Sequence, residues 1–343
     1  MTTDLEDSLT QDRTLRTIKT TVMSRLQTHR EEHIPTQRIL IFGAGVIGSI
    51  YGGLLAKRGH DVTLLARGRR YEELKTNGLC LRQGQQGKEK VEVSVISTLN
   101  PDDIYDYILV AVRADQVEDA LPNLAQNKSK NVVFMVNNAR GYSHWEDAIG
   151  KGRVIPAFPG AGGTIEDGIV RYDITTRSVQ PTTIGEIGKG RTPRLKTLLD
   201  ILSRAGFPTE ISNKMDAWQK THLALVCPLA LGFYYDGGDN YSLASNKPAL
   251  MQVSKALKET FGFIRKSGIG ITPGKFRYVG LVPLPLLAYM LSKIFATPWA
   301  ETFMYHHSIK AKGEMLFLSR ELIALAETRG FALQELKKLL DRS

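Results

Sequence analysis

A glycine-rich turn between an apolar strand and a helix constrains this chain more than any other feature. The predicted strand Arg38–Phe42 is followed by G-x-G-x-x-G at positions 43 to 48 and then by helical apolar spacing. Such a turn bends sharply, approaches a pyrophosphate closely and directs a helix N-terminus at the phosphates. The motif predicts a dinucleotide-binding unit in which Gly43, Gly45, Val46 and Gly48 contact the cofactor. The alternative is a tight turn whose glycines serve only helix packing.

Short apolar runs recur after this turn and predict a parallel sheet. They cover residues 61–66, 107–112, 131–136 and 154–158. Helical patterns separate most of them, and this alternation is typical of a parallel sheet with helices on both faces. Two segments interrupt it with predicted antiparallel strands: residues 79–98, around a turn from Gly84 to Gly87, and residues 169–188.

The rest of the chain has mostly helical apolar spacing. Before Pro35, the apolar residues Leu15, Ile18, Val22 and Leu26 form one helical stripe, and from about residue 214 onward the spacing is helical almost throughout. The predicted fold is an α/β Rossmann-type dinucleotide-binding domain followed by an all-α C-terminal domain. We place an amphipathic extension at 1–36, the Rossmann domain at 37–212 and the helical domain at 213–343.

Composition excludes several classes of protein. The 343 residues include only two cysteines, far apart, which argues against a disulfide framework or a zinc site. The net charge of +10 favours anionic partners, but the basic residues are scattered, so we expect a phosphorylated cofactor or a carboxylate substrate and no nucleic acid. The apolar segment 281–296 is interrupted by prolines and Lys293, so it predicts a packed helix and no membrane partner. The low cysteine count fits a reducing cytoplasm, where we expect the protein to be.

The end of the second predicted strand indicates which dinucleotide binds. NAD-binding versions of the motif usually place an acidic residue there for the ribose hydroxyls. This chain instead reads LLARGRR, with Arg67 and Arg70. A guanidinium can bind a 2′-phosphate through two hydrogen bonds, so the sequence predicts NADP (as NADPH) rather than NAD. The alternative is that both arginines lie in a solvated loop.

Three further positions are candidates for the chemistry. Arg113 and the pair Asn137 and Asn138 end predicted strands, whose carboxyl ends should face the cofactor crevice, although the asparagines also suit an ordinary turn. Lys220 shares a helical stripe with Ala224, Cys227 and Leu231. Burial on such a stripe would disfavour the charged ammonium and suit a proton donor, unless the side chain reaches solvent.

These residues together resemble one family, the ketopantoate reductases (2-dehydropantoate 2-reductases), over roughly residues 37–340. The matching features are the glycine motif, Arg67, VAVRADQ with Arg113, NNARG with Asn138, TIGEIG, Trp218-x-Lys220 and Glu314. The resemblance implies an NADP-dependent cytoplasmic oxidoreductase of pantothenate biosynthesis that reduces a small 2-oxo acid. By position it implies that Lys220 donates the proton, Glu314 binds the substrate hydroxyl, Asn138 lies beside nicotinamide and substrate, and Arg113 stands where the family has a cofactor-binding lysine. A helical substrate domain that forms a homodimer is expected at the family level.

The chain also departs from the family. Ala224 and Pro228 occupy positions where asparagines commonly contribute to the substrate site, which predicts a bulkier or less polar 2-oxo acid than ketopantoate. Two alternatives stay open: a reductase of an unrelated oxo compound, and a non-catalytic NADP-binding regulator. No metal is expected, because the spacing of His306, His307 and Glu314 matches no familiar zinc motif.

Overall fold

The computed structural model describes residues 35–188, 190–235 and 237–343. The chain divides into two units, Met1–Thr36 and Gln37–Ser343, and the second is described below. The apolar stripe predicted between residues 15 and 26 lies outside the described residues. The boundary predicted between residues 212 and 213 stays a prediction; β12 (Thr209–Ile211) precedes it and α7 (Met215–Tyr234) follows it.

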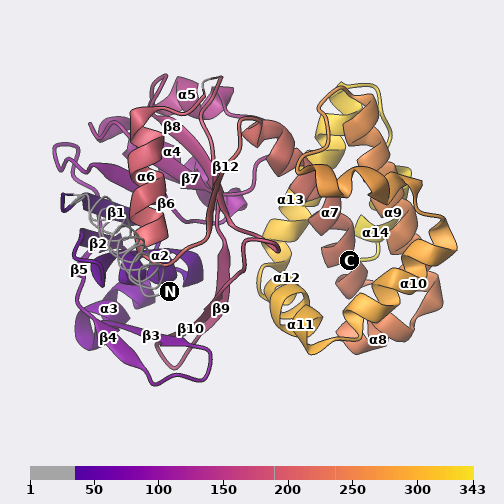
Figure 1. Cartoon of the computed structure of the whole chain (residues 1–343), viewed down its shortest axis with the longest axis horizontal. Coiled ribbons are helices and arrows are strands. Elements are labelled where there is room, and N and C mark those ends of the chain that lie inside the picture. Colours follow the sequence, from indigo (N-terminus) through magenta and orange to yellow (C-terminus); the bar gives the residue numbers. More distant parts are fainter. Residues whose placement is uncertain (1–34, 189, 236) are drawn as a thin grey trace, which may run out of the picture. The chain divides into compact units, whose positions relative to one another are not determined.

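An eight-stranded sheet forms the core of the first half of this unit (Figure 1). Its order is β12-β11-β8-β7-β6-β1-β2-β5, and the run from β8 through β2 is parallel. The strands are β1 (Arg38–Phe42), β2 (Asp61–Leu65), β5 (Ser94–Ile96), β6 (Tyr107–Val110), β7 (Val132–Met135), β8 (Val154–Phe158), β11 (Thr182–Ile184) and β12. The predicted Rossmann-type sheet is therefore confirmed.

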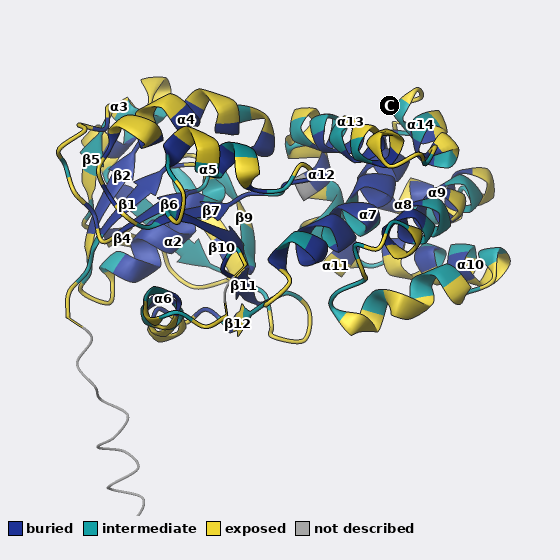
Figure 2. Ribbon diagram, turned by 90° about the horizontal axis from the view of Figure 1, so that it is seen from above, coloured by how far each residue is buried: buried dark blue, intermediate teal, exposed yellow. Residues whose placement is uncertain are grey.

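Helices cover both faces of this sheet (Figure 2). They are α2 (Val46–Ala56), α3 (Gly68–Asn77), α4 (Val117–Gln126), α5 (Ser143–Ile149) and α6 (Pro193–Arg204). The chain passes from β1 to β2 towards the β5 edge of the sheet, whereas it passes from β6 to β7 and β8 towards the β12 edge. Because such crossovers are right-handed, the two directions place α2 and α4 on opposite faces. The carboxyl ends of β1 and β6 then flank the crevice where ligands bind in such sheets.

A second sheet has the order β4-β3-β10-β9. Its strands are β3 (Leu79–Gln83), β4 (Glu89–Val91), β9 (Ala161–Glu166) and β10 (Ile169–Ile174). The hairpin predicted in residues 79–98 is confirmed for β3 and β4, while the last run of that segment is β5, which pairs with β2 in the main sheet.

The antiparallel strands predicted in residues 169–188 are confirmed, but the segment does not form one element by itself. Its two strands pair antiparallel with earlier strands, β10 with β9 and β11 with β8, and lie in different sheets. The reason is the turn at Asp167 and Gly168, where φ is 50° and 75°. Positive φ at both central residues is the requirement of a two-residue hairpin loop, and Asp-Gly is its typical sequence. This turn joins β10 to the strand before it.

The second half of the unit is helical, as predicted. Its main helices are α7, α8 (Asn240–Ser245), α9 (Lys247–Lys266), α10 (Leu284–Phe295), α13 (Lys312–Thr328) and α14 (Gln334–Leu340), with the short α11 (Pro298–Ala300) and α12 (His306–Lys310). The segment 281–296 contains α10, which buries Leu287, Leu291 and Phe295 on one face. Among the described residues, no helix is both long and apolar enough to cross a membrane.

Gln219 ties the first turns of α7 to the carboxyl edge of the main sheet. Its fully buried amide donates hydrogen bonds to the carbonyl oxygens of Val136 (2.8 Å) and Ala157 (3.3 Å), which follow β7 and end β8, respectively. Its Oε1 accepts a hydrogen bond from the hydroxyl of Tyr142 at 2.8 Å. Because a buried amide is costly to leave unpaired, this triple contact fixes the start of α7 against the ends of two strands.

We predict losses of stability of different size for two glycines of the motif. A Cβ at Gly48 would lie 1.9 Å from the carbonyl oxygen of Gly43, whereas a Cβ at Gly45 meets nothing within 4 Å. Gly48→Ala should lower the free energy of unfolding by at least about 1–3 kcal/mol, because backbone must move. Gly45→Ala, the matched control, should cost less than about 1 kcal/mol. Urea unfolding measures both, and equal losses would contradict the packing described here.

Candidate functional site

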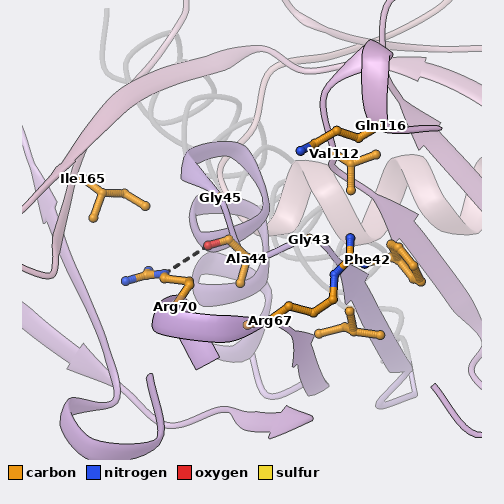
Figure 3. A pocket seen from close by; sticks show the side chains of 11 residues that line it. Phe42, Gly43, Ala44, Gly45, Arg67, Arg70, Val112, Gln116 and Ile165 are labelled. Atoms are coloured by element: carbon orange, nitrogen blue, oxygen red, sulfur yellow. Dashed lines mark hydrogen bonds between the residues drawn. The ribbon is translucent and has the colours of Figure 1, made fainter. Parts of the chain in front are cut away.

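A cavity of about 400 Å³ opens at the carboxyl ends of β1 and β2 (Figure 3). Its walls come from four places: the glycine turn, the start of α3, the loop after β6 and β9 of the second sheet. The lining residues are Phe42, Gly43, Ala44, Gly45, Leu65, Ala66, Arg67, Arg70, Val112, Gln116 and Ile165. The volume and the mostly apolar lining with a few polar groups are typical of a small-molecule site.

The glycine turn brings the start of α2 close to this cavity. Gly43 has φ of 110°, a conformation that favours glycine, and a Cβ there would lie 2.9 Å from Val112 Cγ1. Gly45 is the N-cap of α2 and makes no side-chain capping hydrogen bond, so the N–H groups that begin at Val46 are not capped by a side chain. Open space beyond Gly45 and an uncapped helix start suit the close approach of a phosphate.

The two arginines predicted to bind a 2′-phosphate lie in different surroundings. Arg67 is exposed, lines the cavity and makes no hydrogen bond or ion pair with any residue that the structure describes. Arg70 is engaged: it donates to the carbonyl oxygen of Ala44 at 3.1 Å, to Ser49 Oγ at 3.1 Å and to Glu73 at 2.8 Å. The two side chains extend in different directions from the start of α3 (Figure 3). Arg67 is therefore the side chain available to a ligand.

The loop after β6 contributes a residue that the sequence motifs did not single out. Arg113 pairs with Asp115 at 3.1 Å and is not among the residues that line the cavity, whereas Val112 and Gln116 are. The backbone N–H of Arg113 donates to Gln116 Oε1 at 3.4 Å. Gln116 lies six residues after the end of β6 and is the N-cap of α4, and a glutamine directly before the following helix was the available signal.

Asn138 uses its side chain to build the turn after β7. Its Oδ1 accepts hydrogen bonds from the backbone N–H groups of Arg140 (2.8 Å) and Gly141 (3.1 Å), and its Nδ2 donates to the carbonyl oxygen of Gly141 at 2.6 Å. The side chain is buried, and these contacts are those of an ordinary turn, which was the alternative role for the asparagine pair. The neighbouring Asn137 differs, because its Oδ1 is buried without a hydrogen-bond partner in the described chain. Asn137 thus retains an acceptor for a ligand.

Lys220 is buried on α7 and paired with a carboxylate. Its side chain is 6% exposed, so it does not reach solvent, and its Nζ lies 2.6 Å from both carboxylate oxygens of Asp216, one turn earlier. Asp216 is half-exposed and lies beside the turn after β7, since a Cβ at Gly141 would be 3.6 Å from Asp216 Oδ1. Burial together with the charge of Asp216 raises the pKa of the nearby Tyr142 phenol well above its usual value.

Glu314 links the helical half to the sheet. Its Oε1, on α13, accepts a hydrogen bond from the backbone N–H of Ala114 at 3.0 Å, in the loop after β6. Burial raises the pKa of this carboxyl, and the bond from Ala114 opposes that shift. A second link joins α13 to the turn after β7, because Arg140 forms an ion pair with Glu321 of α13.

The predicted residues therefore fall into two groups along the carboxyl edge of the sheet. Gly43, Gly45 and Arg67 line one cavity. Lys220 and Gly141 of the turn that Asn138 builds both lie beside Asp216, next to the contacts of Gln219, while Glu314 contacts the loop after β6. Among the described residues, Asn138, Lys220 and Glu314 make no direct hydrogen bond with one another.

Ala224 and Pro228 are buried on the same helix as Lys220. The carbonyl oxygen of Ala224 accepts a hydrogen bond from Thr260 Oγ1 of α9 at 2.7 Å. Cys227, one turn after Ala224, is also fully buried, and burial raises the pKa of its thiol to about 12. At both departures from the family pattern, positions 224 and 228, α7 therefore has buried apolar side chains.

Comparison with solved structures supports the architecture. The ternary structure of D-mandelate dehydrogenase with NADH and anilino(oxo)acetate covers 89% of this chain and 96% of its own, with a TM-score of 0.70 and 18% identity. A PanE/ApbA family ketopantoate reductase from Ralstonia eutropha covers 88% and 96%, with a TM-score of 0.71 and 19% identity. At such identities the likeness concerns the fold alone.

Comparison of sequences supports the resemblance to one family. The 2-dehydropantoate 2-reductase of Pyrococcus horikoshii is 30% identical over 184 residues, which are 53% of this chain and 58% of that enzyme. The enzyme of the same name from Aquifex aeolicus is 26% identical over 67% of this chain and 73% of its own length. The chain thus matches less than two thirds of the first of these relatives. The family model described as ketopantoate reductase PanE/ApbA matches residues 39–188 and confirms the resemblance to the ketopantoate reductases there.

Proposed function

We propose that this protein is an oxidoreductase that uses NADPH to reduce a small 2-oxo acid to the 2-hydroxy acid. The observation that carries the proposal is Arg67, a cation without a protein partner in the described chain, in the wall of the cavity that the glycine turn opens. A 2′-phosphate would supply the missing partner. The D-mandelate dehydrogenase structure contains NADH, so the choice of NADPH here rests on Arg67.

The residues around the cavity fit a dinucleotide. The N–H groups at the start of α2 would bind the pyrophosphate, with Gly45 allowing it to approach, and Arg67 would bind the 2′-phosphate. The apolar side chains of Val112 and Ile165 would contact the rest of the cofactor. When bound, the cofactor supplies the hydride, while the protein supplies orientation and charge.

Lys220 is proposed to donate the proton that the reduced carbonyl oxygen receives. Its ammonium is buried, and the ion pair with Asp216 holds it in one place at the carboxyl edge of the sheet. A positioned donor of this kind lowers the barrier because it acts as negative charge develops on the oxygen. Glu314 would bind the substrate hydroxyl, and Asn138 would stabilise the conformation of the turn after β7, next to Lys220.

The substrate is proposed to be less polar than ketopantoate. The buried Ala224 and Pro228 provide no side-chain hydrogen bonds on the lysine helix, and a site without such partners favours apolar substituents. A 2-oxo acid with an apolar or aromatic substituent fits this surface, and anilino(oxo)acetate, bound by the D-mandelate dehydrogenase, is a compound of that kind. A cytoplasmic homodimer, as expected for the family, is part of the proposal.

Arg67→Ala should weaken NADPH binding selectively. Loss of a charge-assisted hydrogen bond to the 2′-phosphate should cost about 1–3 kcal/mol, whereas NADH has no such phosphate and should bind as before. Titration calorimetry with both cofactors measures the effect. The control is Arg69→Ala, which removes an equal charge from an exposed residue that does not line the cavity. A wild-type protein with equal affinity for both cofactors would contradict the assignment.

Lys220→Met should lower turnover by about a hundredfold or more and leave NADPH affinity nearly unchanged, because a proton donor acts in the transition state. The assay follows NADPH absorbance with a panel of 2-oxo acids that includes ketopantoate and aromatic members. The exposed Lys214, at the N-cap of the same helix, gives the control variant Lys214→Ala. Near-normal turnover in Lys220→Met would remove this residue from the mechanism. Cofactor binding without turnover of any panel member by the wild type would instead favour a non-catalytic NADP-binding protein.

A further inference from the structure

The guanidinium of Arg70 contacts the glycine turn from the side of α3. Its Nε lies 3.1 Å from the carbonyl oxygen of Ala44, the residue between Gly43 and Gly45, and Figure 3 marks this bond. One Nη donates to Ser49 Oγ on α2 at 3.1 Å, and Ser49 Oγ itself lies 3.2 Å from the same carbonyl oxygen. Arg70 and Ser49 therefore hold one backbone oxygen from two sides.

Holding this oxygen fixes the direction of the next N–H group. The peptide between Ala44 and Gly45 is planar and trans, so its C=O and N–H point in opposite directions. Gly45 has no side chain, and the space beside it is open, so no packing of its own restrains it. Glycines on both sides of Ala44 give this segment much conformational freedom, so ordering it costs entropy. A contact that orders it before binding therefore strengthens the affinity for any ligand that binds the Gly45 N–H.

Arg70 is itself held in place. Glu73, one turn later on α3, accepts from its other Nη at 2.8 Å, and both side chains are mostly buried, with exposed fractions of 18% and 26%. Gly168, in the turn between β9 and β10, packs on Glu73, since a Cβ there would lie 2.7 Å from Glu73 Oε1. The second sheet, Glu73, Arg70 and the glycine turn thus form one continuous set of contacts.

We propose that Arg70 is a positioning residue for the pyrophosphate-binding turn and contributes equally to the binding of NADPH and NADH. Arg67 alone then distinguishes the two cofactors. This inference rests on the dinucleotide site of the proposed function, and it corrects the expectation that both arginines bind the 2′-phosphate. The pyrophosphate is common to both cofactors, so a residue that shapes its site changes both affinities by the same factor.

The test compares dissociation constants for NADPH and NADH, measured by titration calorimetry on the full chain. Arg70→Lys keeps the positive charge but loses the planar fork that reaches Ala44, Ser49 and Glu73 together. It should raise both dissociation constants by about tenfold, with their ratio unchanged. Ser49→Ala removes one of the two groups on the Ala44 oxygen and should raise both by a smaller common factor. Thermal unfolding confirms that each variant is folded.

Two controls make the outcomes separable. Arg69→Ala should leave both dissociation constants unchanged, and Arg67→Ala should raise only that of NADPH. A selective loss of NADPH in Arg70→Lys and Ser49→Ala would overturn the inference in favour of direct contact between Arg70 and the 2′-phosphate. Unchanged affinities in both variants would also overturn it. A wild-type chain that binds neither cofactor would instead refute the dinucleotide site, and this inference with it.

Discussion

The close approach of α2 to β1 at the glycine turn is the constraint on which the site depends. Gly48 lies so near the carbonyl oxygen of Gly43 that no side chain fits between them. The helix can therefore begin at the edge of the sheet, with its first N–H groups beside the cavity. Arg67 and Arg70 then extend from the start of the next helix; both line the cavity, and Arg70 is also bound to the turn. The start of α2, the cavity beside it and the position of the two arginines at its wall all depend on this one backbone contact.

A second constraint places the helical half next to this edge. Gln219 occupies backbone acceptors after β7 and at the end of β8, and the adjacent residue along the chain is Lys220. Glu314 reaches the loop after β6 from α13. Hydrogen bonds between residues far apart in sequence thus join the helical half, which includes the proposed proton donor, to the strands beside the proposed cofactor crevice. The site is built where they meet, as expected for an open parallel sheet.

The sequence predicted the elements whose signal is local. Strand–glycine–helix spacing placed β1 and α2, and the apolar stripe around Lys220 predicted its burial, because both depend on neighbours within a few turns. Pairing between distant strands was not predictable in this way, as for β10 with β3 and β11 with β8. The hairpin of β9 and β10 is local, and its Asp167-Gly168 turn was visible in the sequence. The different surroundings of Arg67 and Arg70, and the contact of Glu314 with Ala114, depend on tertiary structure and required coordinates.

Transfer of deuterium from the cofactor tests the central claim most directly. The wild-type chain would be incubated with NADPH carrying deuterium in both positions at C4 of the nicotinamide and with the 2-oxo acid that it consumes fastest, and the product would be analysed by mass spectrometry. The account predicts a 2-hydroxy acid with deuterium on C2, because hydride moves from the cofactor to the carbonyl carbon. A hydroxy acid without deuterium, or bound cofactor with no product from any 2-oxo acid, would contradict it.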